Sequence, residues 1–468
     1  MDKNSKIAVL GGGIEGLSVI GYLQKKGYKK ITLCDKNKEY DNPPPGVDLI
    51  TGKNYLKNLT KFEVIFRSPG IHIRSNELQT AAKKGIKITS EIKYFFDNCP
   101  CKIIGITGTK GKGTTSSLIT DILKKAGKDV YLGGNIGTPP LSFLDKLTKN
   151  STVVLELSSF QLQDLKKSPN IAVVLNVTSE HLDYHKSLRE YREAKKSIVK
   201  YQKTSDFAVA NEDYPVSLAY LSKTKAKKHT VSAKKEVKRG AFLKHDTVFL
   251  KTDSKPFPII KRKNIKLPGP HNIENILPAT TVAGILNIKP AIIKKSLQTF
   301  KGLPHRLEHV KTVDGVKYIN DSFSTTPETS IAAINAFEDP IVVIMGGSEK
   351  FSDYTDLGKK IIKRKNVKAV VLMGKTRHRI EKAILEANKK ATKQVRTLQK
   401  QGQKVKNADL PLNLIKVKTF PEAFLAARSK AEKGDIVLLS PACASFDLFK
   451  NYKVRGETFR EAVKKLQS

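Results

Sequence analysis

The sequence has few of the residues that are typical of disulfide-rich proteins or of proteins that stack aromatic side chains on nucleic-acid bases. It has no tryptophan, 7% aromatic residues and four cysteines in 468 residues. The cysteines form no CxxC pair and no Cys/His array of the zinc type, so we expect free thiols in a reducing compartment. They are Cys34, Cys99, Cys101 and Cys443.

Long apolar runs are also missing. No run approaches the roughly 18–20 residues that cross a bilayer, so no membrane partner is expected. The polar segment Met1–Lys6 leads directly into the apolar Ile7–Leu10 and leaves no room for a signal peptide. The sequence therefore predicts a soluble cytoplasmic protein, and 39% apolar residues are enough for ordinary globular cores.

Acidic residues are scarce beside basic ones. Lysine and arginine number 85 and aspartate and glutamate 44, which gives a formal net charge of +41. The densest basic runs, Lys223–Arg239 and Lys389–Lys406, carry no aromatic residues for base stacking. We therefore favour a solvated lysine-rich surface over a nucleic-acid-binding protein, although such a surface attracts anionic substrates. The acid-free stretch 387–408 is predicted to be a surface helix or loop.

Strand-like runs alternate with helix-like stretches through most of the chain, which is typical of α/β domains with parallel sheets. At roughly 150 residues per domain, the length suggests about three domains. We expect domains of residues 1–97, 98–301 and 302–468, joined near Phe300–Pro304. The predicted strands are Ile7–Leu10, Ile31–Cys34, Val64–Phe66, Ile86–Ile88, Lys102–Ile106, Thr152–Leu157, Ile171–Val177, Lys317–Ile319, Ile341–Met345, Ala369–Met373 and Asp435–Leu439.

A first glycine-rich turn follows the first predicted strand. Gly11–Gly16 matches GxGxxG, and Asp35 lies about twenty residues further on. Such glycines let the backbone approach a diphosphate at a helix N-terminus, and the acid binds a ribose. The alternative is a tight strand-to-helix connection without a ligand. Because a UDP-sugar and NAD both carry a diphosphate, an NAD-dependent oxidoreductase stays open at this point.

A second glycine-rich turn is more specific. Gly105–Thr115 joins a predicted strand to a helix through a loop of glycine and lysine. In such loops backbone N–H groups surround phosphates, a lysine such as Lys112 reaches the terminal phosphates, and a hydroxyl holds Mg²⁺. The loop departs from the strict Walker A pattern, because Ile106 stands at the expected first glycine and Gly113 at the expected hydroxyl.

Further motifs follow this loop in order. They are Leu132–Gly137 (LGGNIG), Leu155–Leu162 (LELSSFQL), Asn176–Asp183 (NVTSEHLD), Tyr191–Lys195 (YREAK), Gly269–Asn275 (GPHNIEN), Leu303–Arg306 (LPHR), Asn320–Ser322 (NDS) and Ser440–Asp447 (SPACASFD). With Gly105–Thr115, this set resembles the Mur ligase family over all three expected domains, and it is most similar to the glutamate-adding members. An oxidoreductase or a nucleic-acid-binding protein would leave most of these motifs without a role.

The resemblance implies a fold and an activity. The expected fold is α/β, with a Rossmann-like N-terminal domain for a UDP-sugar, a central P-loop ATPase domain with a parallel sheet, and a Rossmann-like C-terminal domain for glutamate. The expected reaction is the ATP-dependent addition of D-glutamate to UDP-N-acetylmuramoyl-L-alanine through an acyl phosphate, in cytoplasmic peptidoglycan precursor synthesis. The implied partners are these small molecules, and a monomer is expected.

The resemblance also assigns residues to the ligands. Those for ATP are Gly108, Thr109, Lys110, Gly111, Lys112, Gly113, Thr114, Thr115, Asn272, Asn275, Arg306 and Asp321. Those for the UDP-sugar are Gly13, Ile14, Glu15, Asp35, Ser68, Pro69, Gly70, Asn135 and His181. Those for glutamate are Thr325, Lys350, Ser445, Phe446 and Tyr452. The implied catalytic residues are Lys112, Glu156, His181 and Lys195.

Two Mg²⁺ ions are implied as cofactors beside ATP. Thr114 or Thr115 and Glu156 would hold the ion that bridges the ATP phosphates, since hard oxygen ligands suit it. His181 and Lys195 would serve a second ion at the acceptor carboxylate. A lysine ammonium cannot ligate Mg²⁺, but in the family this lysine is carbamylated and becomes an oxygen donor. Without the other motifs, Glu156 would be interpreted as a helix cap, His181 as a loop histidine and Lys195 as a surface lysine.

The sequence departs from the family in two places. Lys36 and Asn37 follow Asp35 where familiar members have Thr-Arg, which weakens the expectation for uracil contacts. Phe323 stands in Asp321–Glu328 (DSFSTTPE) where familiar D-glutamate ligases have a lysine. This variant resembles a branch that includes an L-glutamate-adding ligase, so the same ligation with L-glutamate is the alternative.

Overall fold

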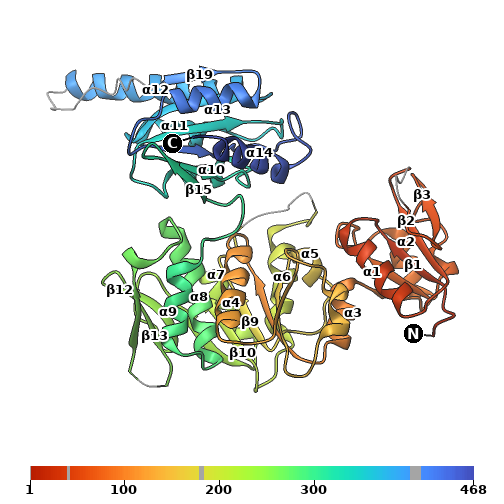
Figure 1. Ribbon diagram of the computed structural model, residues 1–468. Coiled ribbons are helices and arrows are strands. Elements are labelled where there is room, and N and C mark those ends of the chain that lie inside the picture. Colours follow the sequence, from red (N-terminus) through yellow and green to blue (C-terminus); the bar gives the residue numbers. More distant parts are fainter. Residues whose placement is uncertain (1, 39–42, 179–183, 254, 401–412, 468) are drawn as a thin grey trace. The chain divides into compact units, whose positions relative to one another are not determined.

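The computed structural model describes residues 2–38, 43–178, 184–253, 255–400 and 413–467. The chain forms two compact units (Figure 1). The first unit is Met1–Ile265 with Ile273–Phe300, and the second is Lys266–Asn272 with Lys301–Ser468. Among the described residues, none of the helices has the length and apolarity needed to span a membrane.

The first sheet has five parallel strands in the order β3-β2-β1-β4-β5. Strand β1 lies between β2 and β4, and the loop after this strand opens where the strand order reverses, which is where ligands bind in open α/β sheets. Helices α1 and α3 pack on one face and α2 on the other. The elements are β1 (Ile7–Leu10), α1 (Ile14–Lys25), β2 (Ile31–Asp35), β3 (Asp48–Thr51), η1 (Leu59–Lys61), β4 (Val64–Arg67), α2 (Asn76–Lys83), β5 (Lys87–Thr89) and α3 (Glu91–Asn98).

The second sheet has six parallel strands in the order β11-β10-β9-β6-β8-β7. Its strands are β6 (Lys102–Thr107), β7 (Val130–Gly134), β8 (Thr152–Glu156), β9 (Ile171–Val174), β10 (Phe207–Asn211) and β11 (Lys227–Val231). The helical elements among them are α4 (Lys112–Lys125), η2 (Pro140–Ser142), η3 (Leu144–Lys146), α5 (Ser159–Leu162), α6 (Leu188–Lys200), α7 (Pro215–Ala219) and η4 (Tyr220–Lys223). Strands β6 and β8 are apolar almost throughout because both of their faces are covered.

A small antiparallel sheet follows, which the sequence analysis did not predict. Its order is β12-β13-β14, and α8 packs against β12 and against α4. The elements are β12 (Gly240–Lys244), β13 (Thr247–Lys251), β14 (Phe257–Lys261), η5 (Arg262–Asn264), η6 (Pro270–Asn272), α8 (Ile273–Ile285) and α9 (Pro290–Thr299). The predicted alternation of strands and helices, which covers most of the chain, does not extend to this segment.

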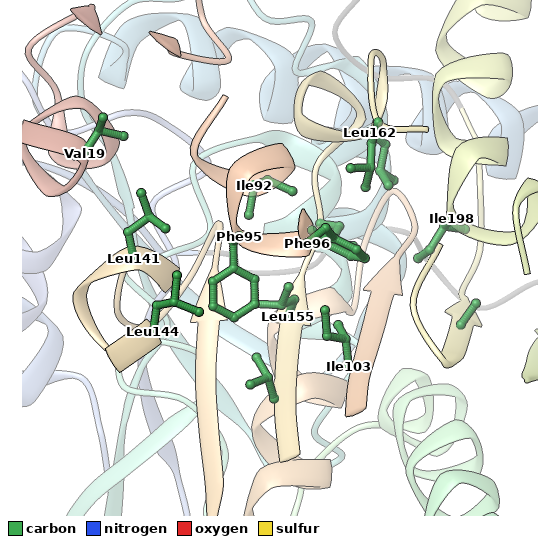
Figure 2. Close-up of a cluster of buried hydrophobic side chains, with 14 of the residues drawn as sticks. Val19, Ile92, Phe95, Phe96, Ile103, Leu141, Leu144, Leu155, Leu162 and Ile198 are labelled. Carbon is green, nitrogen blue, oxygen red and sulfur yellow. The ribbon is translucent and has the colours of Figure 1, made fainter. Parts of the chain in front are cut away.

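One hydrophobic cluster joins the first sheet to the second (Figure 2). Val19 comes from α1, Phe95 from α3, Leu141 from η2, and Ile103 and Leu155 from the centre of the second sheet. All five are less than a tenth exposed, and burying each such side chain stabilises the fold by about 1.5–3 kcal/mol. Helix α3 is thus anchored in a core that contains residues of both sheets.

The third sheet belongs to the second unit and has the order β15-β16-β20-β17-β18-β19, with β15 antiparallel to β16 and the other pairs parallel. Helices α10, α11 and α12 pack on one face, and α13 and α14 on the other. The strands are β15 (Glu308–Val313), β16 (Val316–Asn320), β17 (Ile341–Gly346), β18 (Val367–Met373), β19 (Asn413–Lys416) and β20 (Ile436–Leu439). The helices are α10 (Pro327–Ile334), α11 (Thr355–Lys363), α12 (Arg377–Lys400), α13 (Phe420–Ser429) and α14 (Tyr452–Lys464).

The basic stretch 387–408 is helical over residues 387–400, in the C-terminal part of α12. The remainder of the stretch lies outside the described residues. All four cysteines are free, as the sequence predicts.

Candidate active site

The second glycine-rich turn connects β6 to α4 and leaves the carboxyl end of a central strand. Gly108 and Gly111 have φ of 158° and 87°. A Cβ on Gly111 would collide with the side-chain oxygen of Asn275, so both the backbone angle and the space require glycine there. Lys112 is the first residue of the 14-residue helix α4, and its Nζ donates to the carbonyls of Gly108 (3.0 Å) and Thr109 (2.9 Å). The loop therefore places a cation and backbone N–H groups at a helix start, which favours phosphate.

The remaining predicted residues of this loop lie where the sequence expects them. Thr114 and Thr115 are buried in the first turn of α4, and the Thr115 hydroxyl lies 3.4 Å from the backbone and side-chain oxygens of Asn275. Gly113 is buried beside them, and Lys110 is exposed. The structure thus brings the loop and Asn275 together.

Glu156 ends β8, the strand next to β6, and pairs in register with Ile106. Its side chain is 3% exposed, and Oε1 accepts a hydrogen bond from Nδ2 of Asn135 at 2.8 Å. The other oxygen, Oε2, is buried without a hydrogen-bond partner among the described residues. A buried carboxylate oxygen without a partner is costly unless a cation fills the place. The donor set therefore fits a hard divalent cation beside the phosphate loop.

Lys195 lies on α6 and is 2% exposed. Its Nζ donates to Oγ1 of Thr107 (3.3 Å) and to the carbonyl of Gly108 (3.1 Å), and it lies 4.8 Å from the ring centroid of Tyr191. The Tyr191 hydroxyl lies 3.0 Å from Oγ1 of Thr109. Helix α6 thus holds a buried amine at the phosphate loop, in a place that a surface lysine would not occupy.

His181 lies outside the described residues, so its roles in catalysis, metal binding and UDP-sugar binding stay predictions. Within the part of the chain that the structure describes, no group of three His, Cys, Asp or Glu side chains could hold a metal ion. Of the predicted metal ligands, Glu156 is the one described residue of these four types. The predicted site is therefore not a preformed cluster of carboxylates.

The first glycine-rich turn connects β1 to α1. Asp35 is 8% exposed, and its two oxygens accept hydrogen bonds from the N–H groups of Gly12 (2.6 Å) and Asn37 (2.8 Å). Ser68 lies beside the turn, since its N–H donates to the carbonyl of Leu10 at 3.0 Å. The Asp35 carboxylate therefore shapes the turn itself.

The other predicted UDP-sugar residues surround this turn. Ile14 is 75% exposed, and no atom lies within 4 Å of where a Cβ of Gly13 would be. Glu15 accepts a hydrogen bond from Nε2 of Gln161 at 2.7 Å, and burial raises the pKa of its carboxyl. Pro69 is partly buried and Gly70 exposed, so the surface around the turn is open to a ligand.

A buried arginine that the sequence analysis missed supports this loop. Arg67 is 1% exposed, and its Nη1 donates to the carbonyls of Ser68 (3.3 Å), Pro69 (3.3 Å) and Ile71 (2.7 Å). Its Nη2 forms an ion pair with Asp164 at 3.2 Å. The one sequence signal was a charged residue directly after the apolar run of β4.

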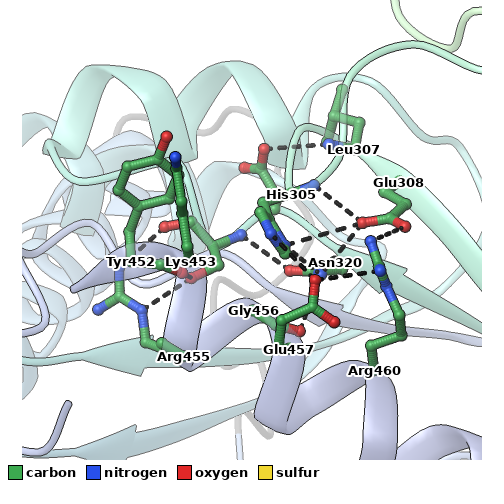
Figure 3. A network of polar contacts seen from close by, with 12 residues as sticks. His305, Leu307, Glu308, Asn320, Tyr452, Lys453, Arg455, Gly456, Glu457 and Arg460 are labelled. Atoms are coloured by element: carbon green, nitrogen blue, oxygen red, sulfur yellow. Dashed lines mark hydrogen bonds and ion pairs between the residues drawn. The ribbon is translucent and has the colours of Figure 1, made fainter. Parts of the chain in front are cut away.

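In the second unit a polar network fixes the turn that carries Arg306 (Figure 3). The flanking residues His305 and Leu307 have φ of 63° and 44°, a conformation that the surroundings must stabilise. Nδ2 of Asn320 lies 3.0 Å from Nδ1 of His305 and 3.2 Å from Oε2 of Glu308. The same Glu308 oxygen accepts the N–H of His305 at 2.8 Å.

Asp321 completes this network. Its carboxylate accepts hydrogen bonds from the N–H of Leu307 (3.2 Å) and from the hydroxyl of Ser440 (2.9 Å). Burial raises the pKa of Asp321 to about 6. On α14, a Cβ at Gly456 would collide with the His305 ring, so glycine is required there. Asn272 also lies in the second unit, where its Nδ2 donates to the carbonyl of Pro268 at 2.6 Å.

Phe323 contacts the side chain of Arg306. The guanidinium carbon lies 3.6 Å from the centroid of the Phe323 ring, and Tyr452 forms a T-shaped pair with the same ring, with centroids 5.0 Å apart. Where familiar members have a lysine, this chain therefore has a ring that holds an arginine by a cation–π contact.

The predicted glutamate residues follow the carboxyl ends of three neighbouring strands, β16, β20 and β17. Ser445 is buried, Thr325 and Tyr452 are partly buried, and Lys350 and Phe446 are exposed, Phe446 by 70%. The carboxyl ends of parallel strands are where ligands bind in open α/β sheets.

A second buried arginine, also missed by the sequence analysis, joins the loops that carry these residues. Arg455 is fully buried and donates to the hydroxyl of Ser322 (3.0 Å) and to the carbonyls of Ser322 (2.9 Å) and Cys443 (3.1 Å). Burial lowers its pKa to about 10. No spacing in the sequence pointed to it, because its partners come from loops far apart in the chain.

The fold and these sites define a class of protein. The chain matches the Mur ligase MurD-like N-terminal domain over residues 5–90, the Mur ligase middle domain over 106–283 and the Mur ligase glutamate ligase domain over 305–443. It belongs to the Mur ligase family and has the three-domain α/β architecture of that family, as the sequence predicts. The exact boundaries of the three domains stay predictions.

Two relatives are similar over their whole length. The UDP-N-acetylmuramoylalanine–D-glutamate ligase of Acetivibrio thermocellus is 39% identical over 473 residues, which cover 100% of this chain and 97% of the relative. The enzyme of the same name from Clostridium kluyveri is 37% identical over 468 residues, covering 98% of this chain and 97% of the relative.

Solved structures show the same fold. The MurC ligase of Thermotoga maritima matches with a TM-score of 0.60 and 18% identity, over 98% of this chain and 99% of that one. The MurF ligase of the same organism, solved in complex with ADP, matches with a TM-score of 0.57 and 19% identity, over 98% and 94%.

Proposed function

We propose that this protein is an ATP-dependent ligase that adds D-glutamate to UDP-N-acetylmuramoyl-L-alanine in peptidoglycan precursor synthesis. The observation that carries the proposal is the full-length similarity, at 39% and 37% identity, to relatives named for this reaction. Because those names specify D-glutamate, the L-glutamate alternative is not supported. The departure at Phe323 is then a variation within D-glutamate ligases.

The phosphate loop supports the use of ATP. On binding, the N–H groups of Gly111 and Gly113 would face the phosphates, and Nζ of Lys112 would exchange its two loop carbonyls for phosphate oxygens. The alanine carboxylate then attacks the terminal phosphorus, ADP leaves, and an acyl phosphate remains. The amine of D-glutamate attacks its carbonyl carbon, loses a proton and displaces phosphate. Lys112 stabilises the charge that develops in the first step.

Glu156 and Thr114 would hold the Mg²⁺ that accompanies ATP. The unpartnered Oε2 of Glu156 and its place beside the phosphate loop support this assignment. The ion would supply neutralisation of the phosphate charge. Asn135 orients the carboxylate by donating to its other oxygen.

Lys195 would act as a carbamate, together with His181, at a second Mg²⁺. The support is its position, since a buried amine at the phosphate loop would repel a cation unless it were modified. Carbamylation reverses the charge and supplies oxygen ligands. The Tyr191 and Thr109 hydroxyls keep α6 at the loop while this happens.

The first glycine-rich turn would hold the UDP diphosphate and the second unit the amino acid. Gly13, Ile14, Glu15, Asp35, Ser68, Pro69, Gly70 and Asn135 would surround the UDP-sugar, with Arg67 as a support for the loop. Thr325, Lys350, Ser445, Phe446 and Tyr452 would bind glutamate, with Lys350 opposite a carboxylate. Asn272, Asn275, Arg306 and Asp321 would complete the ATP site. We further propose that the protein acts in the cytoplasm as a monomer.

A heavy-oxygen label tests the route. UDP-N-acetylmuramoyl-L-alanine with both carboxylate oxygens labelled is incubated with ATP, Mg²⁺ and D-glutamate. The masses of the released phosphate and of the product are then measured by mass spectrometry. We expect one labelled oxygen in each phosphate, and a product that contains one added glutamyl residue and keeps the other labelled oxygen. Phosphate without label would contradict an acyl phosphate.

A further inference from the structure

Two thiols lie in contact in the segment Cys99-Pro100-Cys101. The Sγ atoms are 3.6 Å apart, and Sγ of Cys99 is also 3.6 Å from the carbonyl oxygen of Cys101. Both residues are partly exposed, whereas Cys34 and Cys443 are buried elsewhere in the chain. These two cysteines are therefore the pair that small reagents can reach.

The flanking elements hold the two thiols in place. The N–H of Cys99 donates to the carbonyl of Phe95 at 2.8 Å at the end of α3, which is anchored by buried phenylalanines. On the other side the N–H of Ile103 in β6 donates to the side chain of Asn170 at 2.9 Å. Pro100 between the thiols has a restricted φ. Contact between the sulfur atoms therefore requires little further ordering of the chain.

The two thiols differ in acidity. The hydrogen bond from Cys101 lowers the pKa of Cys99, and the same interaction raises the pKa of Cys101. A thiolate is the attacking species in thiol–disulfide exchange, so Cys99 is suited to react first and Cys101 to resolve the product.

We propose that Cys99 and Cys101 form a redox-active dithiol that low-molecular-weight disulfides convert to an intramolecular disulfide. The Cys99 thiolate attacks a disulfide such as oxidised glutathione, forms a mixed disulfide and releases one glutathione thiolate. Cys101 loses its proton, attacks the Cys99 sulfur and releases the second glutathione. Two protein thiols are oxidised and one glutathione disulfide is reduced to two thiols. This inference concerns the thiols alone and does not rest on the proposed ligase activity.

The disulfide would close a small ring between residues two apart. Small, strained rings raise the reduction potential and make a disulfide easy to reduce. We therefore expect excess reduced glutathione to restore both thiols rapidly, which is the behaviour of a reversible modification and differs from that of a structural disulfide.

The experiment uses the reduced full chain and mixtures of oxidised and reduced glutathione. After an acid quench, free thiols are alkylated under denaturing conditions and the digested protein is analysed by mass spectrometry. We expect the peptide that contains both thiols to become two hydrogens lighter and unlabelled, while Cys34 and Cys443 stay alkylated. In Cys101→Ser, the reaction should stop at a glutathione adduct on Cys99, and Cys99→Ser should react at least about tenfold more slowly.

Three results would overturn the proposal. These are full alkylation of both thiols in the wild-type chain, a wild-type reaction that stops at the glutathione adduct, and equally fast disulfide formation in urea. The last would show that the folded arrangement does not promote the reaction.

Discussion

Phe323 places its ring against the Arg306 guanidinium at 3.6 Å, and Tyr452 packs on the same ring. A cation–π contact of this kind is worth about 0.5–2 kcal/mol. If Arg306 binds ATP, the ring orders the guanidinium before ATP arrives. Phe323 would then be a positioning residue for Arg306.

We predict that Phe323→Leu raises the KM for ATP about 3- to 30-fold, because the ring that orders Arg306 is lost. The KM for D-glutamate should change much less. Phe323→Tyr keeps the ring and is the matched control, with a KM for ATP close to that of the wild type. Steady-state kinetics with each substrate varied in turn measure both constants. An equal rise in both KM values in the two variants would contradict a role through Arg306.

Lys195 supports a second prediction at the same scale. Lys195→Ala should lose nearly all turnover, and a short carboxylic acid such as acetate in the buffer should restore part of it, because the acid supplies the missing oxygen donor. Lys200→Ala, on the same helix but exposed, is the control and should keep normal activity. A loss of turnover that acetate and chloride affect alike would contradict the carbamate.

The sequence could predict which motif residues gather in the fold better than it could predict the buried residues that support the loops. Gly108–Thr115, Glu156 and Lys195 belong to ordered motifs, and the structure brings them together. Arg67 and Arg455 were missed because some of their contacts exist only in the folded chain. Arg67 pairs with the distant Asp164 while it donates to the loop that follows it, and Arg455 donates to carbonyls of loops far apart in the chain. Neither arginine has a local spacing that could reveal it.

At the scale of elements, continuous apolar runs in the sequence predicted strands reliably. The eleven predicted strands are all present, with ends shifted by a few residues at most. They are β1, β2, β4, β5, β6, β8, β9, β16, β17, β18 and β20, whereas β3, β7, β10, β11, β15 and β19 were not predicted. The antiparallel sheet of β12, β13 and β14 was not predicted, because its strands are short and contain several lysines and a proline. Side-chain burial there depends on packing against α8, which local sequence does not report.

Helix α3 carries a carboxyl group whose ionisation opposes folding. Glu91 is 2% exposed and accepts hydrogen bonds from Ser18 (2.8 Å) and Leu141 (3.3 Å), but its Oε2 has no partner in the described chain. Burial, with a smaller contribution from the charge of Glu15, raises the pKa of Glu91 from 4.5 to about 8. The folded chain therefore keeps a proton that the unfolded chain loses.

We predict that the free energy of unfolding falls as pH rises from about 5 to about 8. Over this range the unfolded chain releases the Glu91 proton while the folded chain still holds it, so rising pH favours the unfolded chain. The loss from Glu91 should be on the order of 2–4 kcal/mol. In Glu91→Gln the uncharged side chain should flatten this slope while Glu15 is unchanged. Urea unfolding at several pH values measures it, and parallel slopes in the two proteins would contradict a protonated Glu91.

At the scale of the whole molecule, the net charge of +41 is the dominant feature. ATP and a UDP-sugar are both strongly anionic, so the positive field should raise their local concentration. We predict that salt raises the KM of both substrates several-fold between about 0.05 and 0.5 M, because screening shortens the range of the field. The KM of glutamate should rise less. A KM for ATP that is independent of salt would contradict electrostatic attraction, and sucrose at equal osmolarity controls for water activity.

The central claim is that this Mur ligase adds D-glutamate. Its most direct test is phosphate release from ATP in the presence of Mg²⁺ and UDP-N-acetylmuramoyl-L-alanine, measured in parallel with D-glutamate, with L-glutamate and without an amino acid. We predict release with D-glutamate and only background release in the other two reactions. Release with L-glutamate alone, or with neither amino acid, would contradict the account.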